Sequence, residues 1–477
     1  MPIPIRLLTA ALLMSISLQH PLLIANDAKP ITVTDLRTRK SGTDWPQFLG
    51  PSGDSKSTET GIIKNWPVEG PKVLWELAID QGYCMPTISK GRLFLFDRVR
   101  NENRLRCLNS ENAKEIWTFK YPTDFTDMLG YSGGPRCSPT IDHDRVYVVG
   151  GEGVMHCLNV TTGKVIWKVD TTKKFGVVKN FFGVGCTPII EGDLLIMQIG
   201  GSPPGEGPDV YSVAGKVKAN GTGIVAFNKR TGKVVYKITN ELASYASPTL
   251  TTIKGRRWCF MLCRSGLVAF EPKTGKVDFQ YPWRSTKLES VNASNPIVID
   301  DHVLISECYG IGSSLLKVKP GGYDLIWSDK DKRTRLRSLM THWNTPIHID
   351  GYVYGHSGRH SRGSDLRCIE LKTGKIMWTT DKIDHPPLKQ PLLLTRSSLL
   401  CVDGHFICLS EHGILSLVKI NPKKFELIAA TVLSKPEGQE LNPKLNYPCW
   451  AAPIISQGLL YVRGSKKLIC MELIPKK

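Results

Sequence analysis

A unit of about 50 residues recurs along most of this 477-residue chain and constrains its fold more than any other feature. Each unit opens with a proline, usually after a polar residue, and the opening prolines are Pro86, Pro139, Pro188, Pro248, Pro296, Pro346 and Pro453. The first six are 48 to 60 residues apart. The last gap is 107 residues, and a degenerate copy at 397–417 divides it. The chain therefore holds eight copies.

The second copy shows the pattern within a unit. Short apolar or β-branched runs occupy 138–141, 145–148 and 154–158, and the turn Thr162-Gly163-Lys164 leads into a fourth run that ends at Trp167. Short runs bounded by turn residues are typical of strands. No copy has the i, i+3, i+4 periodicity of an amphipathic helix. We therefore predict four short strands per unit.

The two ends of the repeat region complement each other. Most copies carry an aromatic residue in the fourth strand: Trp117, Trp167, Tyr236, Phe279, Trp327 and Trp378. The eighth copy ends at Leu473 without a fourth strand, whereas an unpaired strand of that type, 73–76, precedes the first copy. Closing a ring with that strand removes exposed sheet edges. The sequence predicts an all-β, eight-bladed β-propeller of four-stranded antiparallel blades, closed by pairing of the N-terminal strand with the last blade.

The chain divides into three regions. Arg6, the apolar run 7–18 and the small residues near Ala25 predict a signal peptide at 1–25. An uncleaved anchor helix is the alternative. Residues 26–72 are rich in Pro, Ser and Gly and predict an irregular segment that runs over the surface, and 73–477 form the propeller. No later stretch reaches 18 apolar residues, so we expect an exported protein, periplasmic or extracellular, with no transmembrane segment after cleavage.

Thirteen cysteines would ordinarily indicate disulfides in an exported protein. Four of them, however, occupy the same position in different copies: Cys107, Cys157, Cys368 and Cys470. Ala226 and Ala269 hold that position elsewhere, which is typical of a small buried core site. We expect most of the cysteines to be free and packed.

These units resemble the pyrroloquinoline quinone (PQQ) propeller repeat, through Ser-Pro, Val-Tyr-Val and Thr-Gly-Lys-x-x-Trp. The segments 44–51 and 449–453 further resemble exported PQQ-like proteins common in planctomycetes. The resemblance covers about 85% of the chain and implies an eight-bladed ring with the first strand of each blade nearest the axis. PQQ-dependent alcohol dehydrogenases share this fold with non-enzymatic scaffolds, such as the lipoprotein that helps to assemble outer-membrane β-barrels. The repeat is thus specific for architecture and weak for function.

If the first strands line a channel, the residues just before them gather on one rim. The candidate binding residues there are Tyr83, Tyr131, Arg136, Phe182, Tyr245, Asn292, His342, Trp343, Asn344, Arg396 and Trp450. Aromatic and arginine side chains suit the anchoring of a partner. The alternative is that they only pack together and close the mouth.

A PQQ enzyme implies a Ca²⁺ ion, an Asp base and a Trp that stacks on the quinone. The rim segments contain no Asp or Glu, and Asp127, Glu241 and Glu289 are candidates only if loops fold back. We therefore predict no catalytic residue, no metal site and no cofactor. If the enzyme interpretation holds, the cofactor is PQQ with Ca²⁺, and Trp343 or Trp450 stacks on it.

The net charge of +19 favours anionic partners. A basic loop at 330–337 is a candidate contact for an anionic envelope surface or a polysaccharide, and export argues against nucleic acid. The leading hypothesis is a protein-binding or scaffolding module of the cell envelope, whose protein or peptide partner docks on the rim or adds a strand to a blade edge. The alternatives are a PQQ-dependent alcohol or sugar dehydrogenase and carbohydrate binding.

Overall fold

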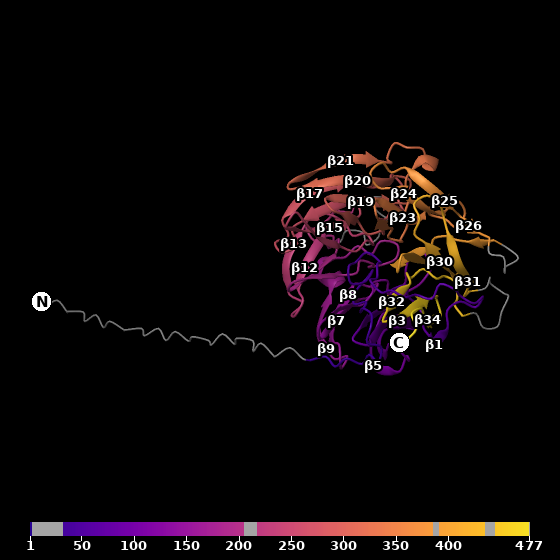
Figure 1. The fold of residues 1–477 in the computed structure, drawn as a ribbon. Coiled ribbons are helices and arrows are strands. Elements are labelled where there is room, and N and C mark those ends of the chain that lie inside the picture. Colours follow the sequence, from indigo (N-terminus) through magenta and orange to yellow (C-terminus); the bar gives the residue numbers. More distant parts are fainter. Residues whose placement is uncertain (2–31, 205–216, 385–390, 435–443, 477) are drawn as a thin grey trace. The chain divides into compact units, whose positions relative to one another are not determined.

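The computed structural model describes residues 1, 32–204, 217–384, 391–434 and 444–476 (Figure 1). The predicted signal peptide, apart from Met1, lies outside the described residues. Within those ranges, no helix has the length and apolarity needed to cross a membrane. Residues 33–477 form one unit by their contacts, and the description below concerns this unit.

Eight four-stranded sheets make up the unit, and in each of them neighbouring strands are antiparallel (Figure 1). Blades 1 to 4 are β2 (Thr87–Ser89), β3 (Arg92–Val99), β4 (Glu102–Asn109) and β5 (Glu115–Pro122); β6 (Thr140–Asp142), β7 (Arg145–Val149), β8 (Val154–Asn159) and β9 (Val165–Asp170); β10 (Ile189–Glu191), β11 (Leu194–Gln198), β12 (Ile224–Asn228) and β13 (Val234–Ile238); β14 (Thr249–Ile253), β15 (Arg256–Leu262), β16 (Gly266–Phe270) and β17 (Val277–Pro282).

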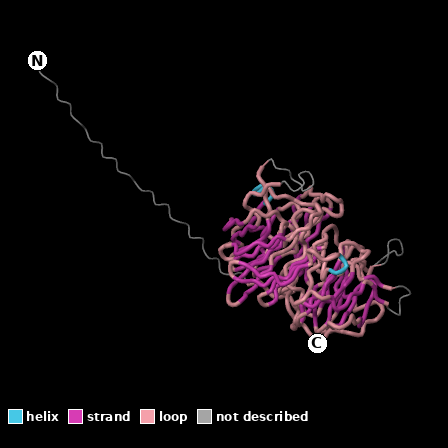
Figure 2. Tube along the Cα trace, turned by 90° about the horizontal axis from the view of Figure 1, so that it is seen from above, coloured by secondary structure: helices cyan, strands magenta, loops and turns pink. Residues whose placement is uncertain are grey.

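Blades 5 to 8 follow in the same order along the chain. They are β18 (Ile297–Ile299), β19 (His302–Glu307), β20 (Gly312–Lys319) and β21 (Gly322–Ser328); β22 (Ile347–Ile349), β23 (Tyr352–Ser357), β24 (Asp365–Glu370) and β25 (Ile376–Thr380); β28 (Ser398–Val402), β29 (His405–Leu409), β30 (Ile414–Lys419) and β31 (Leu427–Val432); β32 (Ile454–Ser456), β33 (Leu459–Arg463), β34 (Lys467–Glu472) and β1 (Val73–Ala78). Outside the blades lie the small sheet of β26 (Lys382–Ile383) and β27 (Leu392–Leu393), the helix α1 (Thr171–Phe175) and the 3₁₀ helix η1 (Thr334–Leu336) (Figure 2).

The predicted closure is confirmed, because β1 pairs antiparallel with β34 and supplies the outer strand of blade 8. Trp75 of β1 lies opposite Cys470, just as Trp117 lies opposite Cys107 and Trp167 opposite Cys157 in blades 1 and 2. The eight-bladed, all-β architecture expected from the repeat is therefore the one observed.

Every outer strand carries a β-bulge beside its fourth-strand aromatic residue, or beside the residue that takes the same position. In blade 1, Leu108 pairs with Glu115 and Cys107 with Trp117, so Ile116 is the extra residue. The register shifts at the same place in the other seven blades. The recurrent cysteines thus face the aromatic residue of the next strand across the ladder. All thirteen cysteines are free and buried, which confirms the expectation of packed thiols.

The outer aromatic residue also joins neighbouring blades. Trp117 Nε1 donates a hydrogen bond to Val160 O of blade 2 at 3.1 Å, and the indoles of Trp75, Trp167, Trp327 and Trp378 make the equivalent bond to the following blade. The Trp117 ring covers Gly163, where a Cβ atom would lie only 2.6 Å from the indole and where φ is +69°. This close approach explains why the turn reads Thr-Gly-Lys.

A second set of bonds joins the blades near the axis. In five of the seven copies that open with a proline, the backbone N–H of the residue before that proline donates to the side chain of the equivalent residue in the next blade. The bonds run from Met85 to Ser138, Ser138 to Thr187, Thr187 to Ser247, Ser247 to Asn295 and Asn295 to Thr345, at 2.8 to 3.1 Å. Because the four middle residues are both donors and acceptors, a small polar side chain is needed there, and this accounts for the polar-Pro signature.

The expectation that residues 26–72 run over the surface holds only in part over the described residues 32–72, where the backbone is irregular and most side chains are exposed or half-buried. Trp45 and Leu49, however, are buried in the core, and Trp45 forms a bridge with Ile88 of the inner strand of blade 1. The same segment accepts a bond from Ile141 of blade 2 at Pro46 O, and another from Cys401 of blade 7 at Ser55 O, both at 2.8 Å. It therefore lies across the apolar inner strands and excludes water from them. Its irregular backbone leaves no periodic pattern in the sequence to reveal this burial.

Candidate functional site

A cavity of about 500 Å³ lies where the blades meet. All eight blades contribute residues from around the start of their first strand, among them Tyr83, Arg136, Tyr245, Trp343 and Trp450. Deeper along the axis, the wall is completed by Phe48, Leu49 and Ser55 of the N-terminal segment. That segment therefore forms the floor of the cavity, and the rim forms its mouth.

The structure brings together ten of the eleven predicted rim residues in the lining of this cavity: Tyr83, Tyr131, Arg136, Phe182, Tyr245, His342, Trp343, Asn344, Arg396 and Trp450. Asn292 does not line it. Its amide Nδ2 instead donates to Cys263 O at 2.7 Å and to Trp283 O at 3.2 Å, so this buried side chain holds two backbone segments together.

Sequence reasoning missed Tyr309 and Arg359, which also line the cavity. Both follow the second strand of a blade, and that strand returns to the face where the first strand begins. An aromatic or arginine residue in the turn between the second and third strands was the signal that could have identified them.

The aromatic residues of the lining form a continuous wall. The Trp450 ring lies 4.8 Å from Tyr83, 5.2 Å from Trp343 and 6.1 Å from Tyr131, measured between ring centroids. Farther round, Phe182 lies 5.8 Å from Tyr245. The inter-ring angles of 47° to 90° are those of tilted and edge-to-face pairs, which are the favoured geometries.

Three arginines lie against this wall, and each is paired with a carboxylate. Arg136 contacts the Tyr83 and Phe182 rings and binds Asp127 at 2.8 Å. Arg359 lies 4.7 Å above the Tyr309 ring and binds Glu289 at 2.9 Å.

Arg396 is the third of these arginines, and it lies over both Trp343 and Trp450 and binds Glu411. The Glu411 carboxylate is fully buried and also accepts bonds from Ser361 Oγ at 2.9 Å and Trp450 Nε1 at 3.3 Å. Burial acts to raise the pKa of Glu411, but the bonds and charge of Arg396 outweigh it and hold that pKa below its ordinary value.

The wall at blade 6 contains buried polar atoms without hydrogen-bond partners. They are Trp343 Nε1, which can only donate, Asn344 Oδ1, which can only accept, and His342 Nδ1. Asn344 is only 5% exposed, and its Nδ2 already donates to Ser397 O at 2.6 Å. Burial lowers the pKa of His342 to about 3, so this imidazole is neutral at pH 7. Buried polar atoms are usually satisfied, so these three are exceptions in the packing of blade 6 behind the cavity surface.

The residues present do not fit a resident Ca²⁺ ion with PQQ. Ca²⁺ takes six to eight oxygen ligands, usually with carboxylates among them. The three carboxylates that contact the lining arginines, Asp127, Glu289 and Glu411, are each neutralised by that arginine. Among the described residues, no group of three or more His, Cys, Asp or Glu side chains has the arrangement of a metal site. Both Trp343 and Trp450 already pack against Arg396 and against each other.

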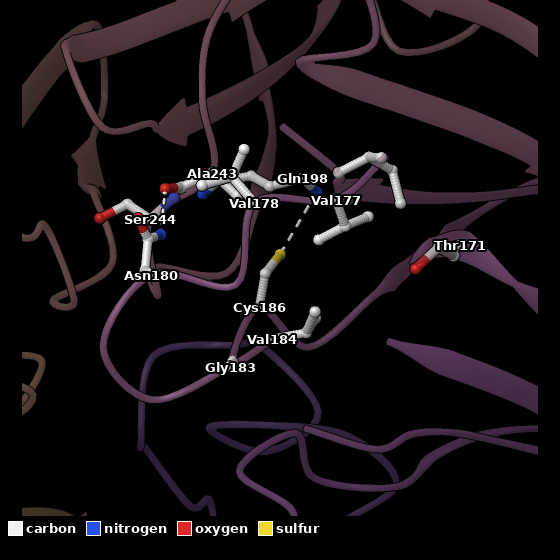
Figure 3. Close-up of a pocket in the computed structure, with 12 residues that line it drawn as sticks. Thr171, Val177, Val178, Asn180, Gly183, Val184, Cys186, Gln198, Ala243 and Ser244 are labelled. Atoms are coloured by element: carbon white, nitrogen blue, oxygen red, sulfur yellow. Dashed lines mark hydrogen bonds between the residues drawn. The ribbon is translucent and has the colours of Figure 1, made fainter. Parts of the chain in front are cut away.

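A second, much smaller cavity lies beside the first, near blades 3 and 4 (Figure 3). Its volume of about 10 Å³ has room for a single water molecule at most. The polar side chains around it are already engaged: Asn180 Nδ2 donates to Ala243 O at 2.7 Å, and Gln198 Oε1 accepts from Ser244 N at 2.8 Å. This cavity is part of the packing between blades and not a functional site.

Comparisons with known proteins agree with this architecture. The family profile described as outer membrane protein assembly factor BamB matches residues 101–380. Among solved structures, BamB from Moraxella catarrhalis is 12% identical, with a TM-score of 0.53, over 84% of this chain and 97% of that one. Quinohemoprotein alcohol dehydrogenase from Comamonas testosteroni is 12% identical, with a TM-score of 0.62, over 91% and 81% of the two chains. These two likenesses concern the fold.

An uncharacterised protein of Rickettsia conorii is 23% identical over 185 residues. The match spans 37% of this chain and 36% of that protein, so the similarity covers about a third of the relative's length.

Proposed function

Because this chain belongs to the family described as outer membrane protein assembly factor BamB, we propose that it is an exported protein-binding propeller whose partner inserts a side chain into the central cavity. The observation that carries the proposal is the cavity itself, with aromatic walls and three arginines around about 500 Å³. Pockets that bind a partner combine an apolar wall with a few precisely placed polar groups.

Exposed apolar residues at the mouth support the same proposal. Leu129, Tyr131 and Tyr447 line the cavity and are 51%, 59% and 49% exposed, and Met128 beside them is 42% exposed. Apolar residues gathered at the entrance of a pocket are typical of an interaction surface, whereas residues that merely close a channel would be covered.

The blade edges are less suitable for a partner that adds a strand. Each outer strand is bulged, at Ile116 in blade 1 and at Ile166 in blade 2, for example. A bulge interrupts the row of free N–H and C=O groups that an added strand needs. Of the two docking modes expected from the sequence, the rim is therefore the favoured one.

Site-specific photo-crosslinking tests the proposal. A photoreactive phenylalanine analogue replaces Tyr131 at the mouth or, as the control, Ile166 on an outer strand, where exposure is similarly high at 42%. We expect envelope proteins to crosslink through position 131 and not through position 166, and Trp343→Ala with Trp450→Ala to reduce the product. Equal products at both positions, none at position 131, or a product unaffected by the tryptophan changes would refute cavity docking.

A PQQ-dependent oxidoreductase is the second candidate, favoured by the two indoles in the cavity. Its test is the addition of PQQ and Ca²⁺ to the purified protein, followed by desalting and dye reduction with alcohols or aldoses. Retention of one quinone per chain together with turnover would establish the enzyme and overturn the binding proposal. Retention of sugars in the same cavity, with neither quinone retention nor turnover, would instead support carbohydrate binding. Export is tested by N-terminal sequencing of the protein from the periplasmic fraction, where we expect cleavage near Ala25.

A further inference from the structure

The rim carries a concentration of positive charge on one side of the mouth. Six cations from two loops make up this basic surface: Arg284, Lys287, Lys330, Arg333, Arg335 and Arg337. The first loop connects blades 4 and 5, and the second connects blades 5 and 6. Among the described residues, none of the six has a carboxylate within ion-pair distance, whereas Lys332 and Arg359 nearby are paired.

The two loops enclose the turn that brings Tyr309 to the cavity. Ser285 Oγ of the first loop donates to Tyr309 O at 2.7 Å. From the second loop, Arg337 Nη1 lies 4.0 Å from the position that a Cβ atom would occupy at Gly310. Because the Tyr309 ring lines the cavity and carries Arg359 above it, the two loops reach the mouth through Ser285 and Arg337.

Few carboxylates oppose this charge. Asp329 and Glu289 are taken up by Lys332 and Arg359, and the other carboxylates nearby are the exposed Asp331 and the half-buried Glu241, whose charge acts on Arg284. Glu307, at the base of the turn, is buried, and burial raises its pKa to about 7. The positive potential on this side of the mouth is therefore largely uncompensated, and it attracts carboxylates over roughly one Debye length, about 8 Å at physiological salt.

The cavity beside this surface is lined by aromatic side chains, among them Tyr309, Trp343 and Trp450. Such a wall suits an aromatic or aliphatic side chain. A lipid headgroup satisfies the cations alone, whereas a polypeptide satisfies the cations and also places an apolar side chain in the cavity.

We propose that the partner is an acidic polypeptide segment: it places Asp or Glu side chains on the basic surface and an aromatic or aliphatic side chain in the cavity. This inference rests on the proposed function and specifies the chemistry of the partner. The acidic residues supply attraction and orientation, and the inserted residue supplies most of the affinity.

Selection from a random peptide library displayed on phage tests it, with the full-length exported chain as bait. We expect the selected peptides to carry two or more Asp or Glu residues close to one aromatic or aliphatic residue. A synthetic peptide from the selection should bind at least tenfold more weakly to a K330E/R333E/R335E variant. The matched control, K164E/K233E/K276E, changes the net charge equally at exposed turns of the opposite face and should bind as the wild type does.

The outcomes separate the two levels of the proposal. Peptides that lose binding in W343A/W450A but show no enrichment in acidic residues would refute the acidic partner and leave cavity docking standing. Peptides insensitive to the tryptophan changes, or no selected peptide at all, would refute both. Binding to phosphatidylglycerol vesicles that depends on Lys330, Arg333 and Arg335 and displaces the peptide would assign the basic surface to a membrane and overturn the inference. Folding of each variant is checked by circular dichroism.

Discussion

Replacement of Arg396 by methionine should strip the buried Glu411 carboxylate of its counter-ion. The two side chains form a bidentate pair at the cavity wall, with Glu411 fully buried and Arg396 only 15% exposed. Breaking a buried pair from one side costs about 3–5 kcal/mol, because the remaining charge has neither water nor a partner. We expect a loss of that size near pH 8.

The pH dependence gives this prediction its sign. In the wild type the pKa of Glu411 is lowered below its unfolded value of about 4.3, so its contribution to stability is present above that pH and is lost on acidification. In Arg396→Met, burial without the cation should raise the pKa above the unfolded value. Stability should then fall as pH rises from 5 to 8, by up to about 1.4 kcal/mol per pH unit.

The double variant Arg396→Met with Glu411→Gln is the control, because it removes both charges together. We expect it to recover about 2–3 kcal/mol relative to Arg396→Met and to lose the additional pH slope. The measurement is urea unfolding followed by tryptophan fluorescence at pH 5.5 and 8.0. If Arg396→Met is as stable as the wild type at pH 8, or if the double variant is no more stable than Arg396→Met, then the buried Glu411 carboxylate does not depend on the charge of Arg396.

Further predictions concern the packing, the titration and the thiols. Trp117→Ala should lower the free energy of unfolding by about 3–5 kcal/mol, since it removes an indole and its hydrogen bond to the next blade. Gly163→Ala should also destabilise the fold, because it forces a Cβ atom against the same indole. Thermal unfolding measures both, and a neutral result for either variant would contradict the described contact between the two blades. His356 is buried and its pKa is lowered to about 3, so on acidification this residue takes up a proton in the unfolded chain before it does so in the folded chain. The free energy of unfolding should therefore fall by about 2 kcal/mol from pH 7 to pH 5. His356→Gln should remove that share of the slope, and an unchanged slope would show that His356 titrates normally. A thiol reagent should find no reactive cysteine in the native protein and thirteen after unfolding, with no change in Tm on adding a reductant. Trp45→Ala should destabilise by about 3–5 kcal/mol, as expected for a buried indole and not for a surface segment.

The repeat pattern is enough to predict the architecture, because the same physical requirement recurs in every copy. The glycine under the Trp117 ring, the cysteine opposite that ring and the polar residue before each proline each satisfy a local contact with an adjacent strand or blade. Local contacts of this kind leave a regular pattern, and the ring closure followed from counting strands. The rim position of ten candidate residues followed as well, because it depends only on where the first strands begin.

Tertiary structure alone decided what the rim residues contact. Arg396 and Glu411 are 15 residues apart with the two strands β28 and β29 between them, and no spacing rule predicts that their charges cancel over the Trp450 ring. The buried course of Trp45 was equally hidden, because an irregular segment covers the inner strands through contacts that never repeat. Other contacts, such as the Arg359–Glu289 ion pair and the Trp343–Trp450 ring contact, join residues from different blades, and they are set by the three-dimensional path of the chain and not by local pattern.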